Sequence, residues 1–151
     1  MNNVLIRQAL LSDLNALVPL FDSYRQFYDR ESDLDAAREF LKARFSHSES
    51  VIFIAIAGES AVGFVQLYPS FSSVSLARTF ILNDLYVSPE VRRCGVANQL
   101  IRAAVEYAGS LGAIRLTLST AMTNEPAQLL YQSSGWQRDQ QFYVYHYPVP
   151  A

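Results

Sequence analysis

The feature that most constrains the fold is an unbroken apolar run at residues 51–57, Val-Ile-Phe-Ile-Ala-Ile-Ala. The run is short and rich in β-branched residues, which is typical of a strand that is covered on both faces. Gly58 and Glu59 follow as turn residues, and a second apolar run at 61–68 supplies the returning strand of a hairpin. Because such a strand must be covered, we expect a sheet with helices on its faces.

The spacing of apolar residues predicts the other elements. Ser12 is expected to cap the first of four predicted helices, which cover residues 12–24, 33–45, 95–108 and 124–133. Strand patterns lie at residues 4–7, 80–87 and 114–119, with one or two more strands within 136–147. The serine-rich piece at 69–75 predicts a loop or a strand distortion. The order β-α-α-β-β-β-α-β-α-β indicates the α/β or α+β class, in a single domain over residues 1–151.

Composition excludes several classes of protein. Half of the 151 residues are hydrophobic and 17% are charged, which excludes a disordered chain. Twelve basic and fourteen acidic residues give a net charge of −2, so bulk charge favours no nucleic-acid partner. The single cysteine, Cys94, excludes an internal disulfide, and the two lone histidines predict no metal site. Signal-peptide and membrane-spanning patterns are absent, so we expect a cytoplasmic protein without a membrane partner.

The segment between the strand at 80–87 and the following helix has the properties of an anion site. It reads Arg92-Arg93-Cys94-Gly95-Val96-Ala97. The first turn of a helix has unpaired N–H groups and the positive end of the helix dipole. Gly95 would let a ligand approach the backbone, and the two arginines add positive charge. A diphosphate would satisfy these groups, although neither the Walker nor the Rossmann glycine pattern is present.

Two motifs in this half of the chain resemble those of the GCN5-related N-acetyltransferase superfamily. The first is R-x-x-G-x-A, matched by Arg92, Gly95 and Ala97. The second is N-x-x-A-x-x-L-Y-x-x-x-G-W, matched by Asn124, Ala127, Leu130, Tyr131, Gly135 and Trp136. The resemblance implies a mixed, mostly antiparallel sheet of six to seven strands with about four helices. It also implies splayed central parallel strands and an acetyl-CoA-dependent N-acetyltransferase.

The resemblance further implies where the coenzyme binds and which group protonates the thiolate. The diphosphate would lie on the turn and the pantetheine arm against the backbone of residues 85–87, where an N–H would polarise the thioester carbonyl. Tyr131 matches the family's general acid, and its phenol has a suitable pKa. The implied coenzyme-binding residues are Leu85, Tyr86, Val87, Arg92, Arg93, Cys94, Gly95, Val96, Ala97, Asn98, Asn124 and Tyr131.

Asp84 is the candidate general base, because a carboxyl group inside an otherwise apolar strand is costly without a function. Strand alternation places Asn83 and Asp84 on opposite faces, so only one of them can face the cleft. An aspartate is shorter than the glutamate that many relatives have nearby, so it could act through a water molecule. In the alternative reading, Asp84 caps a loop or pairs with a nearby arginine.

The acceptor is expected to be a primary amine of a small molecule. This amine would attack the thioester directly, without an acyl-enzyme. Tyr24, Phe27 and Tyr28 are candidates for an aromatic pocket wall, together with Asp84, and the alternative reading of the aromatic residues is core packing with a solvated rim. Two alternatives stay open: acetylation of a protein N-terminus or lysine, and a non-catalytic acyl-CoA-binding sensor. The aromatic strand expected at 142–147 could pair two copies into a homodimer.

Overall fold

The computed structural model describes residues 3–151, which divide into two compact units, residues 3–119 and 120–151. The first unit contains a single sheet in the order β1-β2-β3-β4-β5. All neighbouring strands in it are antiparallel except the parallel pair β4–β5. Its strands are β1 (Val4–Gln8), β2 (Val51–Ala57), β3 (Ser60–Ser72), β4 (Ala77–Val87) and β5 (Leu116–Thr117). The predicted class, a mixed and mostly antiparallel sheet with helices, is confirmed.

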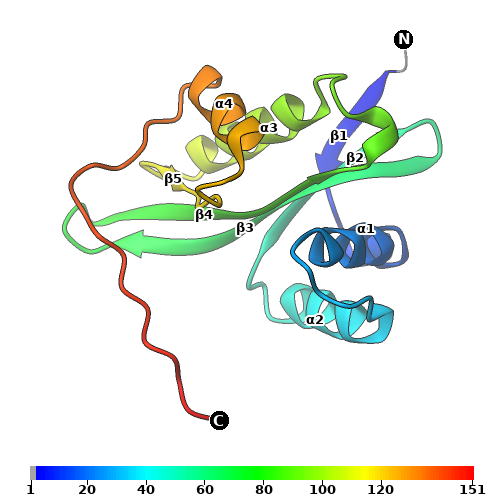
Figure 1. Ribbon diagram of the computed structural model, residues 1–151, viewed down its shortest axis with the longest axis horizontal. Helices are drawn as coiled ribbons and strands as arrows, with labels where there is room; N and C mark the ends of the chain where they lie inside the picture. The colour runs from blue at the N-terminus through cyan, green and yellow to red at the C-terminus, as the bar shows by residue number, and fades with distance from the viewer. Residues whose placement is uncertain (1–2) are drawn as a thin grey trace. The chain divides into compact units, whose positions relative to one another are not determined.

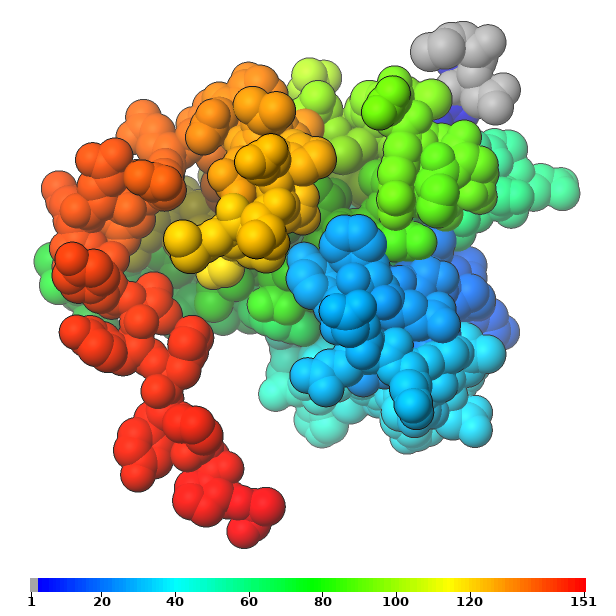
Figure 2. All heavy atoms as spheres, in the orientation of Figure 1, coloured from blue at the N-terminus to red at the C-terminus, as the bar shows by residue number. Residues whose placement is uncertain are grey.

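Helices cover both faces of this sheet. The helices of the first unit are α1 (Leu14–Phe27), α2 (Leu34–Ser46) and α3 (Val96–Ser110), with short 3₁₀ turns at Leu11–Asp13 and Pro89–Val91. Figure 1 shows α1 and α2 on one side of β3 and β4 and α3 on the other. In the space-filling view the atoms of α1 and α2, blue to cyan, form one continuous layer (Figure 2). The hairpin is therefore covered above and below, as its apolar sequence predicts.

Aromatic contacts mark the two layers of the core. Phe64 of β3 lies edge-on to Phe21 of α1, with ring centroids 6.1 Å apart. Phe80 of β4 makes the corresponding contact with Tyr107 of α3 at 5.8 Å. A Cβ at Gly63 would lie 2.8 Å from the Tyr86 carbonyl oxygen, so only glycine fits this close approach of β3 to β4.

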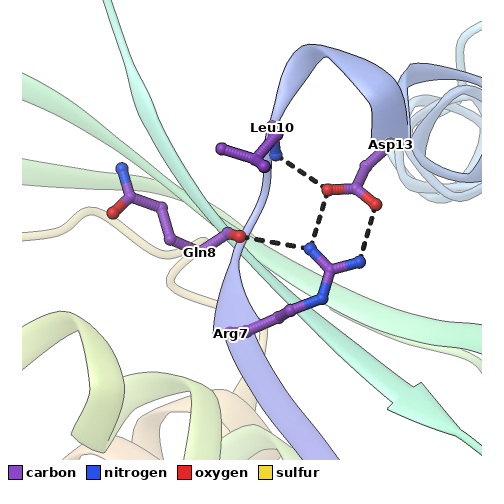
Figure 3. Close-up of polar contacts among 4 residues, drawn as sticks. All are labelled: Arg7, Gln8, Leu10 and Asp13. Atoms are coloured by element: carbon purple, nitrogen blue, oxygen red, sulfur yellow. Dashed lines mark hydrogen bonds and ion pairs between the residues drawn. The ribbon is translucent and has the colours of Figure 1, made fainter.

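The entry into α1 differs from the prediction of a Ser12 cap. The chain enters through the 3₁₀ turn, and Ser12 lies inside it. The carboxylate of Asp13 instead accepts the Leu10 N–H at 2.7 Å and both guanidinium nitrogens of Arg7 at 2.8 Å (Figure 3). This bidentate pair joins the end of β1 to the start of α1. The Asp13 carboxylate accepts three hydrogen bonds here, and the single oxygen of a serine hydroxyl could not accept all three.

Two other boundaries can be compared with the predictions, one set by strand pairing and one by a helix cap. The sequence predicts a loop or a strand distortion at 69–75, and the loop is wrong over the first half, because β3 continues to Ser72 and pairs with β4 as far as the partners Ser72 and Ala77. The turn occupies residues 73–76. The start of the second helix is confirmed: Asp33 caps α2, and its Oδ1 accepts the Ala36 N–H at 3.0 Å.

The second unit contains one helix, α4 (Glu125–Ser133), where the sequence predicts a helix over 124–133, and Asn124 caps it. The strands predicted within 136–147 are wrong: residues 136–151 form no strand. The described chain therefore has five strands and not six to seven. A strand needs a neighbour for its N–H and C=O groups, and these residues have none within their unit. Consecutive side chains there, Phe142 to Tyr145, are all exposed. Among the described residues no helix is long and apolar enough to cross a membrane.

Candidate functional site

A β-bulge in β4 shapes the centre of the site. Gln66 of β3 pairs with Asp84, whereas the next residue, Leu67, pairs with Leu82, so Asn83 has no partner across the strands. The Asn83 carbonyl oxygen accepts the Tyr24 hydroxyl at 3.2 Å, and its Nδ2 donates to Asp84 Oδ1 at 2.7 Å. The prediction that Asn83 and Asp84 face opposite sides is therefore wrong, because the bulge interrupts the alternation. Both residues line one cavity.

The Asp84 carboxyl is buried and held by amide groups. The residue is only 2% exposed. Its Oδ2 accepts Nε2 of Gln66, while Oδ1 accepts Asn83. Burial raises the pKa of Asp84 above its ordinary value, and the hydrogen bonds from Gln66, Asn83 and Tyr24 oppose this only in part. No arginine pairs with Asp84 within residues 3–151. A buried carboxyl with a raised pKa and no ion-pair partner is suited to accepting a proton.

The cavity beside Asp84 lies between α1, α2, β3 and β4 and has a volume of about 440 Å³. Its lining is mostly aromatic and aliphatic, with one guanidinium, and consists of Phe21, Tyr24, Arg25, Ala36, Ala37, Phe40, Tyr68, Asn83 and Asp84. Of the four candidate acceptor residues, Tyr24 and Asp84 therefore line the cavity. Phe27 and Tyr28 do not: Tyr28 lies edge-on to the Tyr24 ring at 5.2 Å, and Phe27 packs on Tyr28 at 5.3 Å.

The two tyrosines of the cavity are held in the neutral form. Burial and the charge of Asp84 raise the pKa of Tyr68 to about 12 and that of Tyr24 further. Both hydroxyls are therefore protonated at neutral pH and act as hydrogen-bond groups. Asp84 is the one carboxyl group among the residues that line this cavity.

Tyr68, Phe40 and Gln66 are residues that sequence reasoning missed. A signal for Gln66 is present in the sequence, since it is a polar residue inside an apolar strand, as Asp84 is. No comparable signal identifies Phe40, because an aromatic residue on a helix is usually part of the core.

One edge of β4 is unpaired beside the cavity. The parallel pairing with β5 includes only Phe80 and Ile81 of β4. In the described residues of the first unit, no strand pairs with 83–87 on that edge. The expected splayed parallel strands are thus present, and Leu85 and Tyr86 lie in the part of β4 that β5 does not pair with. Arg92 Nε donates to the Val87 carbonyl oxygen at 2.8 Å, which ties the end of the strand to the following turn.

The turn into α3 is open and positively charged. Gly95 caps α3 with φ 80°, and a Cβ placed there would meet no atom within 4 Å. Arg93 has φ 66°, and Arg92 lies over the Tyr86 ring at 5.5 Å. Gln99 donates to the Gly95 carbonyl oxygen at 3.1 Å, which closes the first helical turn. The N–H groups of Val96 and Ala97, which precede it, have no intrahelical acceptor by geometry.

These features fit the diphosphate of coenzyme A. The turn has open space at Gly95, helix-end amides and arginine charge in one place. Cys94 is exposed, and its Sγ lies 3.7 Å from the Arg92 carbonyl oxygen, so it contributes to the turn without a catalytic partner. Within the described part of the chain, no group of three or more His, Cys, Asp or Glu could hold a metal ion.

The two candidate residues of the second unit have local roles there. Asn124 Oδ1 accepts the Ala127 N–H at 3.2 Å and so begins α4. Tyr131 lies on α4, with its ring centroid 5.9 Å from that of Trp136. It stays a prediction that Asn124 and Tyr131 bind the coenzyme. The role of Tyr131 as the acid also stays a prediction.

The model of the acetyltransferase (GNAT) family matches residues 14–136. Together with the bulged β4, the splayed parallel pair and the open turn before α3, this match shows that the chain belongs to the GNAT family and is an N-acetyltransferase.

Particular relatives support the same assignment. The chain is 50% identical over 146 residues to the "Uncharacterized N-acetyltransferase YhfO" of Bacillus subtilis (strain 168), covering 97% of this chain and 98% of that protein. A crystal structure of a probable acetyltransferase is 46% identical with a TM-score of 0.92, over 97% of this chain and 99% of that one. The aminoglycoside N-acetyltransferase AAC(6')-Iy, solved in complex with CoA, shares the fold at 22% identity with a TM-score of 0.82, over 99% and 97% of the two chains.

Proposed function

We propose that this protein transfers the acetyl group of acetyl-CoA to a primary amine of a small molecule by direct attack in a ternary complex. The observation that supports this most is the bulge at Asn83 and Asp84, because it joins two features of one strand. Its residues line the cavity, and they also begin the unpaired edge of β4. An amine in the cavity would thus meet a thioester lying along that edge.

Coenzyme A would bind at the turn and at the strand edge. The amides at the start of α3, beginning at Val96, and the charge of Arg92 and Arg93 suit its diphosphate. The backbone of Leu85 and Tyr86 suits the amides of the pantetheine arm, and an N–H there would stabilise the developing oxyanion. The coenzyme supplies the activated thioester when it is bound. The aminoglycoside acetyltransferase that shares this fold was solved with CoA, which supports a coenzyme site on this scaffold.

Asp84 would act as the general base. An amine enters at neutral pH as an ammonium ion and must lose a proton before its nitrogen can attack. The buried carboxylate of Asp84 is placed in the cavity wall, and its raised pKa makes it a better proton acceptor than an exposed aspartate. The nitrogen then attacks the thioester carbonyl, the thiolate leaves, and the positively charged amide nitrogen releases its remaining extra proton to solvent. In this proposal Tyr131 returns a proton to that thiolate.

A small acceptor is favoured by the shape of the cavity. A volume of about 440 Å³ lies in the range of small-molecule sites, and four elements enclose it. The aromatic rings of Tyr24, Phe40 and Tyr68 would pack against the carbon skeleton of the amine or against its ammonium group. An aminoglycoside acetyltransferase with this fold gives a precedent for a small amine substrate.

The test is a thiol-release assay with acetyl-CoA, a panel of small amines, and peptides with free N-termini or lysines. We expect turnover with small amines and intersecting lines in double-reciprocal plots, as a ternary complex requires. Parallel lines would contradict direct attack. Turnover on peptides alone would support the protein-acetylating alternative, and CoA binding without any turnover would support the sensor.

Ala36→Leu tests whether the cavity is the acceptor site. Ala36 is exposed on α2 and lines the cavity, so the larger side chain would fill part of it without disturbing the core. We expect the KM for the amine to rise about tenfold while the KM for acetyl-CoA is unchanged. Glu39→Leu is the matched control, since Glu39 is exposed on the same helix and does not line the cavity. Equal effects of both variants on the amine KM would contradict the assignment.

A further inference from the structure

Gln66 is a buried polar residue at the centre of the sheet that the proposed reaction does not yet use. It is completely buried in β3 and pairs directly across the strands with Asp84. Its Nε2 donates to Asp84 Oδ2. A carboxylate can only accept, so the side of the amide that faces an ionised Asp84 is the NH₂ group.

The other half of the Gln66 amide is unsatisfied. Its Oε1 is buried without a hydrogen-bond partner among the described residues. An unpaired buried carbonyl oxygen lowers the stability of a fold, and an apolar side chain of similar length would avoid that cost. Core packing therefore does not explain a glutamine at this position, whereas a role toward Asp84 does.

The groups around Asp84 show what the glutamine contributes. From α1, Tyr24 and Arg25 line the cavity, and Tyr24 contributes a hydrogen bond that lowers the pKa of Asp84. Tyr68 of β3 and Asn83 of β4 also line the cavity, and Asn83 donates a hydrogen bond to Asp84. The part of α2 that lines the cavity is uncharged, with Arg44 on that helix affecting Tyr68. Neutral amides thus hold the carboxylate, which leaves it more basic than a bidentate arginine would.

We propose that Gln66 is a positioning residue that fixes the Asp84 carboxyl and supports it in both of its protonation states during acetyl transfer. This rests on the proposed function of Asp84 as the base. Before the reaction, Nε2 donates to the carboxylate. When Oδ2 has taken the proton of the ammonium group, a half-turn of the amide brings Oε1 to accept the new O–H. Gln66 Oε1, which has no hydrogen-bond partner among the described residues while Asp84 is ionised, then has one.

Gln66→Met tests the proposal, because methionine has similar length and cannot donate a hydrogen bond. We expect the acid limb of the kcat–pH profile, at saturating concentrations of both substrates, to move up by about one pH unit. The KM for acetyl-CoA should be unchanged, and the melting temperature of the variant should not be lower than that of the wild type. Gln26→Met, on the exposed part of α1, is the matched control and should leave the profile unchanged. A fall in the melting temperature with an unmoved acid limb would show that Gln66 is merely structural and would overturn the proposal.

A second measurement does not depend on turnover. In protein labelled with ¹³C at the aspartate carboxyl groups, the Asp84 signal is identified by its loss in Asp84→Asn. We expect its titration midpoint to move up by about one pH unit in Gln66→Met. An unmoved midpoint would contradict the proposal for Gln66. If the midpoint moves but the wild-type protein acetylates no amine or peptide, the contact is confirmed and the proposed function fails.

Discussion

At the scale of single residues, Asp84 combines a cost in stability with a chemical use. Its carboxyl is buried among neutral groups, so the charged form is disfavoured and the pKa is raised. The same shift makes the carboxylate a stronger base near neutral pH. A residue that serves only the fold would not need this environment.

The first prediction concerns catalysis. Asp84→Asn keeps the size of the side chain and removes its basicity, so we expect kcat/KM for the amine to fall by about 10²- to 10⁴-fold. The affinity for CoA, measured by calorimetry, should be unchanged. Full kcat/KM at neutral pH in the variant would remove Asp84 from the role of base.

The second prediction concerns stability. Because the pKa of Asp84 is raised in the folded protein, the folded form keeps its proton to higher pH than the unfolded chain. The wild-type protein therefore loses stability from this group as pH rises from about 4 through the folded pKa. Asp84→Asn should be increasingly more stable than the wild type over that range, with no such gain below it.

Urea unfolding of both proteins at several pH values measures this difference. Other carboxyl groups contribute equally to both proteins; the pKa of Asp13, for example, is lowered mainly by its hydrogen bond with Arg7. Their contribution cancels in the comparison. A difference between the two proteins that is independent of pH would contradict the raised pKa of Asp84.

The third prediction concerns Tyr131. If its phenol protonates the thiolate, Tyr131→Phe should lower kcat by about 10²-fold and change its dependence on alkaline pH. The ring contact with Trp136 can persist in the variant, since phenylalanine keeps the ring. An unchanged kcat across the pH range would remove the acid role.

At the scale of secondary-structure elements, the turn before α3 and the bulge in β4 differ in how well the sequence reveals them. Gly95 is the N-cap of α3, close to where the sequence predicts that this helix begins, and its left-handed φ of 80° favours glycine. The bulge at Asn83 depends on the register between β3 and β4. No local pattern in β4 predicts that register. Strand alternation therefore placed Asn83 and Asp84 on opposite faces of β4, whereas both line the cavity.

The fourth prediction compares two glycines that both have positive φ. Gly95 has φ 80° and Gly58 has φ 63°, and a Cβ would meet no atom at either position. Alanine at either site should therefore lower the free energy of unfolding by a similar amount, about 1 kcal/mol. Only Gly95→Ala should also weaken CoA binding, by roughly tenfold, or about 1.4 kcal/mol. Equal CoA affinity in the two variants, by calorimetry, would contradict a diphosphate site at this turn.

At the scale of the whole molecule, the sequence predicts one domain, while the contacts of the chain define two units, 3–119 and 120–151. The sheet and three helices form the first unit. The aromatic segment at 142–147 forms no strand, so the predicted pairing of two copies through it has no preformed strand to use. Formation of a homodimer stays a prediction that light scattering would check.

The fifth prediction tests the single domain. Trp136 is the only tryptophan of the chain and lies in the second unit, whereas most helix and all strands lie in the first. If the chain is one cooperative domain, tryptophan fluorescence and far-UV circular dichroism should give the same urea midpoint. A separate, earlier fluorescence transition would show that the second unit unfolds alone.

The sequence by itself determined the class of sheet, the four helices with starts near Asp33, Gly95 and Asn124, and the membership of the family. These depend on local spacing and on the conformational demands of single residues, which act within a few positions of the chain. The tertiary structure alone decided the bulge, the partners of Asp84, the acceptor cavity and the extent of the strands. Each of these depends on which distant segment lies alongside, since hydrogen bonds across a sheet and burial are made with residues far away in the chain.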